Sequence, residues 1–238
     1  HRTIWDMSQS EHYSTTNKTL ILSDSSGSLP GFALLELLKP TTDKNIQSAG
    51  ITLNDKIYIS SSLYRRRTCS QIFPNSTEHG PCGSGKVFGI DYDIAQSFAC
   101  DCWPPSAYQW MDRCESCLDF RVVYDIVRNG CHFVPIGNSL SNYVNEEWRI
   151  SFSLAEQKMV YSMNHCQFLT YGLLKIFLKK VINQQKMKTD NLLCSYHIKT
   201  VILWAIQQNT TMHICPENLL EFFWICFKLL IKWVYEGV

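Results

Sequence analysis

The chain has 238 residues, of which 45% are hydrophobic, and a formal net charge of +1. This apolar content suffices for one large domain or two lobes, and the near-zero net charge excludes a chain drawn to nucleic acid or membrane by its overall charge. Eleven cysteines lie without regular spacing, and their odd number prevents complete pairing within one chain. We therefore predict free thiols in a reducing compartment, with a cytoplasmic or nuclear location.

Both ends of the sequence are typical of a cut segment. The chain begins at His1 rather than Met, and it stops at Val238 directly after a strongly apolar run. We expect a fragment of a longer protein.

The first third of the chain predicts strands separated by turns. Short apolar runs at residues 19–22 and 32–38 are separated by Ser, Gly and Pro residues, which favour turns. Residues 56–64 predict a further strand. Residues 65–85 predict a long loop, because they combine an arginine run with a glycine-rich end.

Residues 87–94 predict another strand, and in it Asp91 and Asp93 share one face. Two carboxylates so placed could hold a divalent cation, since Mg²⁺ prefers carboxylate oxygen, although most strand aspartates simply meet water. The preceding Gly83-Ser84 resembles the Gly-Ser turn that polymerase-beta-type nucleotidyltransferases place before a D-x-D strand. Only six residues separate the two parts here, which leaves little room for the usual intervening helix.

The next segment predicts a helix at 110–127 and a turn at Asn129-Gly130. Residues 131–136 then predict an extended segment at a sheet edge, because Pro135 cannot donate to a neighbouring strand.

The stretch 147–156 changes from strand to helix. Three apolar residues alternate with three polar ones, in the order Trp148, Arg149, Ile150, Ser151, Phe152 and Ser153. A strand of this pattern buries one set and turns the other toward a cavity or solvent. Ser153 and Glu156 match an S-x-x-E capping box, which predicts a helix through about Asn164.

The remainder of the chain predicts three helices. The first runs from Gln167 to about Gln184, and the second from Asp190, as N-cap, to Gln208. The last opens at Cys215-Pro216 and is nearly apolar through Tyr235. Its few charges fall close to one face, which favours a buried core helix with one polar stripe over a membrane span.

Two motifs give the chain a family resemblance. W-R-I-S-F-S-L-A-E at 148–156 and S-Y-H-I-K-T at 195–200 are similar to motifs of the Mab-twenty-one (male-abnormal) family, relatives of cyclic GMP-AMP synthase. Residues 98–112 and 125–133 resemble its invertebrate, mollusc-like members. The resemblance covers nearly the whole chain and is strongest from residue 98 onward.

The resemblance implies an α+β fold: a bilobed nucleotidyltransferase-type structure with a strand-rich lobe followed by an all-helical lobe. Residues 1–140 would form a partial nucleotidyltransferase core lobe, and residues 141–238 an incomplete helical lobe. The intact parent would bind ATP or GTP with Mg²⁺ or Mn²⁺. It would make a cyclic dinucleotide on sensing double-stranded RNA or DNA in innate immunity. The alternative is a catalytically inactive scaffold or adaptor.

The resemblance also implies a set of nucleotide-binding residues, which are Arg149, Ser151, Ser153, Glu156, Lys175, Ser195, Tyr196 and Lys199. Arg149 would reach a base edge, where its planar fork of donors suits base acceptors. Tyr196 would stack on a base, while Lys175 and Ser195 would contact phosphate. In the alternative interpretation Ser153 and Glu156 only cap a helix, and Tyr196 belongs to a core.

The metal-binding carboxylates that catalysis requires are only partly matched. Asp93 is similar to the third metal-binding carboxylate of the family's enzymes, and Asp91 is the fallback. The family's E-x-D pair has no match between His1 and Asn17, nor does one follow Gly27-Ser28. One carboxylate cannot hold two metal ions, so we expect this chain by itself to lack turnover.

Overall fold

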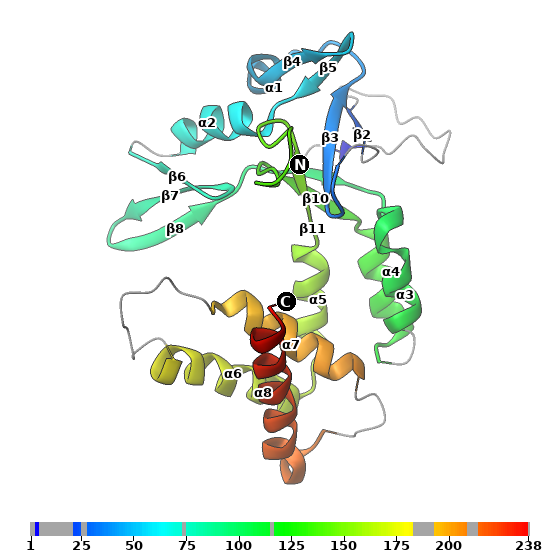
Figure 1. Ribbon diagram of the computed structural model, residues 1–238, viewed down its shortest axis with the longest axis vertical. Helices are drawn as coiled ribbons and strands as arrows, with labels where there is room; N and C mark the ends of the chain where they lie inside the picture. Colours follow the sequence, from blue (N-terminus) through cyan, green and yellow to red (C-terminus); the bar gives the residue numbers. More distant parts are fainter. Residues whose placement is uncertain are drawn as a thin grey trace. The chain divides into compact units, whose positions relative to one another are not determined.

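The computed structural model of the chain has the predicted α+β fold and contains two compact units (Figure 1). Unit 1 comprises residues 1–108 and 125–155, and unit 2 comprises residues 109–124 and 156–238. The structure describes residues 3–4, 21–24, 28–72, 75–114, 117–182, 193–208 and 214–237. The domain boundary near residue 140 stays a prediction, because compact units are defined by packing rather than by family relationship.

Unit 1 is built on an eight-stranded sheet. Its main path runs β1 (Thr3–Ile4), β9 (Phe98–Cys100), β10 (Cys131–Val134), β11 (Trp148–Ser151), β3 (Phe32–Leu37), β5 (Lys56–Ile59) and β4 (Gly50–Leu53), and β2 (Ile21–Asp24) pairs with β3. β10 lies between β9 and β11, so the prediction of an edge strand there was wrong. Pro135 follows the last residue of β10 and therefore interrupts no strand pairing.

The apolar face of this sheet forms the core of unit 1. Trp148 is fully buried, and its indole Nε1 donates a hydrogen bond to the carbonyl oxygen of Ile59 at 2.7 Å. The rings of Tyr64 and Phe98 pack against it, with ring centroids 4.9–5.3 Å apart. Aromatic groups from three distant parts of the sequence thus hold β11 in place.

The segment 56–85 differs most from prediction. Of the strand predicted at 56–64, only β5 (Lys56–Ile59) is found, and helix α2 (Ser61–Ile72) follows after Ser60. Tyr64, Thr68 and Cys69 are buried, and this i, i+4, i+5 spacing gives α2 a packed face while Arg66 and Arg67 are exposed. The remainder of the predicted loop contains two strands, β6 (Thr77–His79) and β7 (Cys82–Val87). Together with β8 (Ile90–Ile94) they form a separate three-stranded sheet.

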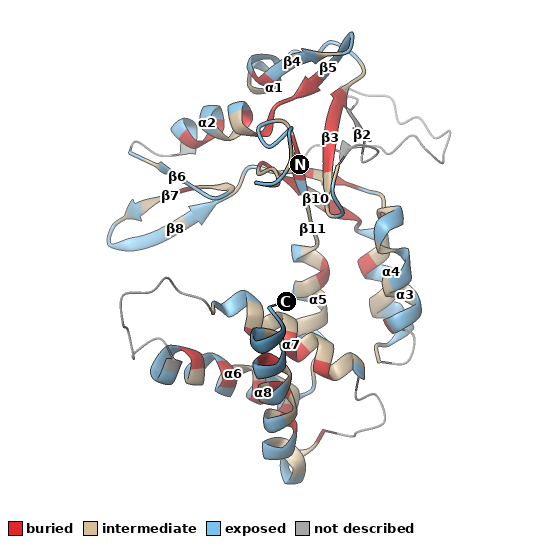
Figure 2. Ribbon diagram, in the orientation of Figure 1, coloured by how far each residue is buried: buried red, intermediate tan, exposed pale blue. Residues whose placement is uncertain are grey.

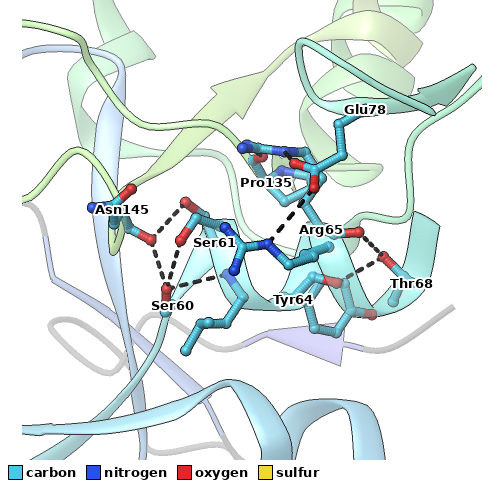
Figure 3. Close-up of polar contacts among 11 residues, drawn as sticks. Ser60, Ser61, Tyr64, Arg65, Thr68, Glu78, Pro135 and Asn145 are labelled. Carbon is cyan, nitrogen blue, oxygen red and sulfur yellow. Dashed lines mark hydrogen bonds and ion pairs between the residues drawn. The ribbon is translucent and has the colours of Figure 1, made fainter. Parts of the chain in front are cut away.

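The N-terminus of α2 is fixed by one backbone carbonyl, that of Asn145 (Figure 3). It accepts hydrogen bonds from Ser60 Oγ at 2.7 Å, Ser61 Oγ at 3.2 Å and the Ser62 N–H at 3.0 Å. Ser60 and Ser61 are buried, so these bonds form away from solvent. They hold the connection between β10 and β11 three residues before β11 begins.

Arg65 holds the other end of that connection. Its Nη1 donates to the carbonyl oxygen of Pro135 at 2.7 Å, and its Nε pairs with Glu78 Oε2 at 2.9 Å (Figure 3). The connection is therefore tied to α2 both after β10 and before β11.

The predicted helix at 110–127 is two helices. The 3₁₀ turn η1 (Pro105–Ala107) leads into α3 (Tyr108–Cys114), and α4 (Phe120–Arg128) follows. The Asn129-Gly130 turn is confirmed. Gly130 has φ +64°, and a Cβ added there would lie 1.9 Å from the carbonyl oxygen of Cys100.

Most of unit 2 is helical, as predicted. Besides most of α3 and the first residues of α4, its elements are α5 (Ser153–Tyr161), whose first residues belong to unit 1, α6 (His165–Phe177), the π-helical turn η2 (Leu178–Ile182), α7 (Ser195–Gln208), the 3₁₀ turn η3 (Pro216–Asn218) and α8 (Leu219–Glu236). Asn164 caps α6 in a reciprocal capping box with Gln167. The predicted N-cap Asp190 lies outside the described residues.

Helix α8 has three faces rather than the predicted two. Its buried face carries Phe222, Cys226 and Leu230, and its charged side chains, Glu221, Lys228 and Lys232, are exposed as predicted. The prediction missed a further apolar face, which is exposed and consists of Leu220, Trp224, Ile231, Val234 and Tyr235. Among the described helices, none combines the length and the apolar composition that crossing a bilayer requires.

Candidate functional site

Strand β11 presents Arg149 and Ser151 on the face opposite the core, as the alternation predicts. Arg149 is exposed and lies opposite Phe32 of β3 and Val134 of β10. Ser151 is half-buried and lies opposite His132 of β10. The backbone of Arg149 is therefore held on both sides, by β3 and by β10, whereas Ser151 is paired with β10.

The predicted capping box at Ser153 and Glu156 is replaced by a longer-range contact. Helix α5 begins at Ser153, and Glu156 Oε2 accepts a hydrogen bond from Lys199 Nζ of α7. The side chains are only 22% and 26% exposed, respectively, so water screens this ion pair less than one on the open surface. Glu156 therefore positions a lysine of another helix rather than an N-terminal backbone group.

The first turn of α7 presents an aromatic ring to solvent. Tyr196 is 57% exposed, so the alternative that places it in a core is wrong. Lys199 Nζ lies 5.6 Å from the centroid of the Tyr196 ring, which is within cation–π range. Ser195 is exposed at the first position of the helix. Tyr196, Lys199 and Glu156 thus lie together in unit 2, and Ser195 precedes Tyr196 in the same helix.

Lys175 lies on α6 and is exposed. Its Nζ is 5.0 Å from the ring centroid of Tyr171, one helical turn earlier. The contact leaves the ammonium in solvent, where it can still bind an anion.

Asp93 and Asp91 lie on β8, paired with β7. Ser84 Oγ donates a hydrogen bond to Asp93 Oδ1, and Lys86 Nζ lies 3.3 Å from Asp91 Oδ1. Gly83 and Ser84 lie inside β7 rather than in a turn, which agrees with the short spacing that leaves little room for the usual intervening helix.

Nucleotidyltransferase domains generally use divalent metal ions. Within the ranges that the structure describes, no three His, Cys, Asp or Glu side chains are grouped to hold one. Asp91 and Asp93 are each engaged by a neighbour on β7 and do not by themselves fit a two-metal centre.

Sequence reasoning missed two residues of unit 1. Burial raises the pKa of the Cys82 thiol, the negative charge of Asp93 raises it further, and Arg149 opposes both. The charges of Asp93 and Arg149, which are 56 positions apart in the sequence, therefore both influence the pKa of Cys82. Burial also lowers the pKa of His132, whose Nδ1 is buried and has no hydrogen-bond partner among the described residues. No motif marks either residue.

The predicted residues fall into two groups by unit. Unit 1 contains Asp93, Arg149, Ser151 and Ser153, and unit 2 contains Glu156, Lys175, Ser195, Tyr196 and Lys199. The contacts described above each join residues of the same unit.

Comparison with protein families agrees with this architecture. Residues 51–162 match the family described as Mab-21 protein nucleotidyltransferase domain. The match spans α2, the β7–β8 hairpin with Asp93, and β11 with Arg149 and Ser151. Residues 51–162 of the chain thus carry a Mab-21 nucleotidyltransferase domain.

Proposed function

We propose that the protein binds a nucleoside triphosphate, ATP or GTP, through the first turn of α7. The observation that carries this proposal is the exposed Tyr196 ring beside the Lys199–Glu156 ion pair. An exposed aromatic face suits a nucleobase, because stacking is worth about 1–3 kcal/mol per base and requires no hydrogen bonding. The nucleotidyltransferase domain supports a nucleotide as the ligand.

The charges around Tyr196 suit the remainder of such a ligand. Glu156 offsets the charge of Lys199 and fixes its position, so that Lys199 stays next to the ring rather than sampling solvent. Ser195 contributes a hydroxyl at the N-terminus of α7, where unpaired backbone N–H groups favour an anion. Lys175 adds a further cation from α6 for phosphate.

Calorimetric titration with ATP and GTP tests this proposal. Tyr196→Ala should weaken binding by about 1–3 kcal/mol, roughly 5- to 150-fold, because it removes the stacking face. Tyr235→Ala is the matched control, since Tyr235 is a 92% exposed tyrosine on α8, and it should leave affinity unchanged. Equal affinity of the two variants for ATP and GTP would contradict the proposal.

Arg149 gives a second test within unit 1. By the family resemblance Arg149 recognises a nucleobase edge, so Arg149→Ala should weaken nucleotide binding and Arg149→Lys should not restore it, because lysine lacks the planar fork. Full recovery in Arg149→Lys would indicate a simple charge effect instead of base recognition.

Catalysis is a separate and larger proposal. With Mg²⁺ or Mn²⁺, a form of this protein that supplies carboxylates beyond Asp91 and Asp93 would make a cyclic dinucleotide from ATP or GTP. Double-stranded RNA or DNA would activate it, as in an innate-immune sensor. Incubation of that form with both nucleotides, metal and double-stranded RNA, followed by chromatography, tests for the product.

The second candidate function is a non-enzymatic scaffold. The exposed apolar face of α8 favours it, because Leu220 at 68% and Trp224 at 53% exposure add apolar surface that the core of unit 2 does not use. Detection of a cyclic product in the incubation above would exclude this alternative.

A further inference from the structure

Helix α6 exposes an apolar stripe on its outer face. Leu169, Leu173 and Ile176 follow one another at i, i+4 and i+7, so they lie along one side of the helix. These side chains are 41%, 40% and 59% exposed, and Phe168 beside them is 52% exposed. The other face of α6 is buried in the core of unit 2 and carries Cys166, Thr170 and Leu174. The stripe is therefore apolar surface that the folding of unit 2 leaves uncovered.

The charged side chains of α6 and of the turn η2 that continues it are all lysines. Lys175, Lys179 and Lys180 are exposed, and the sequence contains no Asp or Glu from Asn164 to Thr189. Lys179 and Lys180 lie three and four positions after Ile176, which places them at the end of the apolar stripe. Among the described residues, none of these three lysines forms an ion pair. The outer face of α6 and η2 is thus both apolar and cationic.

The exposed apolar face of α8 lacks this excess of positive charge. Glu221 and Glu236 accompany Lys228 and Lys232 on that helix, so its two acids offset its two bases. Lys232 Nζ also lies 3.8 Å from Glu236 Oε1. An anionic surface is therefore attracted to α6 and η2 and not to α8.

The combination of lysines with apolar side chains favours one kind of partner. A second copy of this face is disfavoured, because its lysines would meet lysines of like charge. A nucleic acid would pair with the lysines through its phosphates but would leave Phe168 and Ile176 in water. An anionic bilayer suits both features, because its headgroups attract lysine and the boundary of its acyl chains takes up apolar side chains.

We propose that the outer face of α6 and η2 docks on the anionic surface of a lipid bilayer. Helix α6 lies in the plane of the interface, and Leu169, Leu173 and Ile176 enter the boundary between headgroups and acyl chains. Lys179 and Lys180 extend their apolar stems along this boundary and bind lipid phosphates through their ammonium groups. Only one face of α6 enters the lipid, while the other stays packed in unit 2. This contact uses neither Tyr196 nor Lys199 of the proposed nucleotide site.

Flotation of the whole chain with lipid vesicles tests the proposal. Vesicles of equimolar phosphatidylcholine and phosphatidylserine should bind the chain, whereas vesicles of phosphatidylcholine alone should bind it far less. Raised salt should weaken the binding, because it screens the attraction between the lysines and the headgroups. Absence of binding to the phosphatidylserine vesicles at low salt would overturn the proposal.

Matched pairs of lysines separate this face from a general effect of charge. Replacing Lys179 and Lys180 together by Gln should weaken vesicle binding by about 5-fold per lysine. Replacing Lys228 and Lys232 of α8 by Gln removes the same charge elsewhere in unit 2 and should leave binding unchanged. Equal losses in the two double variants would mean that net charge alone attracts the chain, which would overturn the proposal.

Matched isoleucines test the apolar part of the contact. Ile176→Ser should weaken vesicle binding by about 5-fold, because it removes an aliphatic side chain from the lipid. Ile231→Ser, at a 52% exposed position of α8, is the control and should have no effect. Unchanged binding in Ile176→Ser would show a purely electrostatic contact and overturn the proposal. A dimer in analytical ultracentrifugation that Ile176→Ser dissociates would assign the face to a second copy instead.

Discussion

Strands β11 and β8 have similar alternating sequences, yet only β11 has a buried face. In β11 Trp148 is fully buried, whereas in β8 Ile90 is 72% and Ile94 is 37% exposed (Figure 2). Both strands carry predicted site residues, Arg149 on β11 and Asp93 on β8. Alternation therefore predicts a strand in each case without predicting what covers it.

The difference comes from residues far away in the sequence. β11 lies between β10 and β3, and its tryptophan packs on Tyr64 and Phe98. β8 is an edge strand of the three-stranded sheet and pairs with β7 alone. The strand that carries Arg149 is consequently held in place by the core on its other face. Asp93 is held by the pairing of β8 with β7 and by the Ser84 hydroxyl.

The largest loss of stability is expected from a substitution of Trp148. Trp148→Ala should lower the free energy of unfolding of unit 1 by about 3–5 kcal/mol, because it removes a buried indole and leaves a cavity. It also leaves the carbonyl oxygen of Ile59 without its 2.7 Å donor. Urea unfolding followed by far-ultraviolet circular dichroism measures the change.

Ile90→Ala is the control from β8. With 72% of the side chain already in solvent, its cost should stay within about 0.5 kcal/mol. A cost close to that of Trp148→Ala would mean that β8 has a covered face after all.

Two glycines give the next largest effect. Gly130, just before β10, and Gly89, in the β7–β8 turn, have φ +64° and +81°, so alanine is strained at both. Gly130→Ala also places its Cβ 1.9 Å from the Cys100 carbonyl oxygen, whereas nothing lies within 4 Å at Gly89. We expect a loss of about 1 kcal/mol for Gly89→Ala and of more than about 2 kcal/mol for Gly130→Ala in thermal unfolding. Equal losses would show that β9 moves away freely.

Local patterns predicted much of the fold. The alternation at 148–152 placed Trp148 in the core and Arg149 outside, because a period of two assigns faces without knowledge of neighbours. The i, i+3 spacing of Tyr196 and Lys199 likewise placed both on one face of α7. The family resemblance added which of these faces matter.

The remainder depends on contacts that no local pattern encodes. Glu156 fits a capping box by sequence, yet Lys199, 43 positions later, takes its carboxylate. Helix α2 was missed because its packed face is formed by Tyr64, Thr68 and Cys69 rather than by an aliphatic stripe. Its start depends on the carbonyl oxygen of Asn145, 85 positions from Ser60. Such partners become visible only once the chain has folded.

Ser60 tests the link between α2 and β11 with a smaller effect. Ser60→Ala should cost about 1–2 kcal/mol, because it removes a 2.7 Å hydrogen bond from a side chain that is 1% exposed. Ser70→Ala on α2 is the control, since its bond to the Arg67 carbonyl is exposed and should contribute less than about 0.5 kcal/mol. The denaturant midpoints of the two variants are compared. Equal midpoints would mean that the Ser60 bond to the Asn145 carbonyl contributes little to stability.

The smallest expected effect is a gain at the tip of the β7–β8 hairpin. Phe88 is fully exposed at φ +49° and precedes Gly89 at φ +81°, so the two residues form a turn with both φ values positive. Such two-residue turns favour Asn-Gly, because asparagine tolerates the left-handed region better than a bulky aromatic residue does. Phe88→Asn should therefore stabilise the hairpin by about 0.5 kcal/mol, seen as slower amide exchange along β8. Phe88→Ala removes the same exposed ring without this preference and should bring no gain. If both variants slow exchange equally, the exposed ring itself destabilises the hairpin, and the turn geometry contributes nothing.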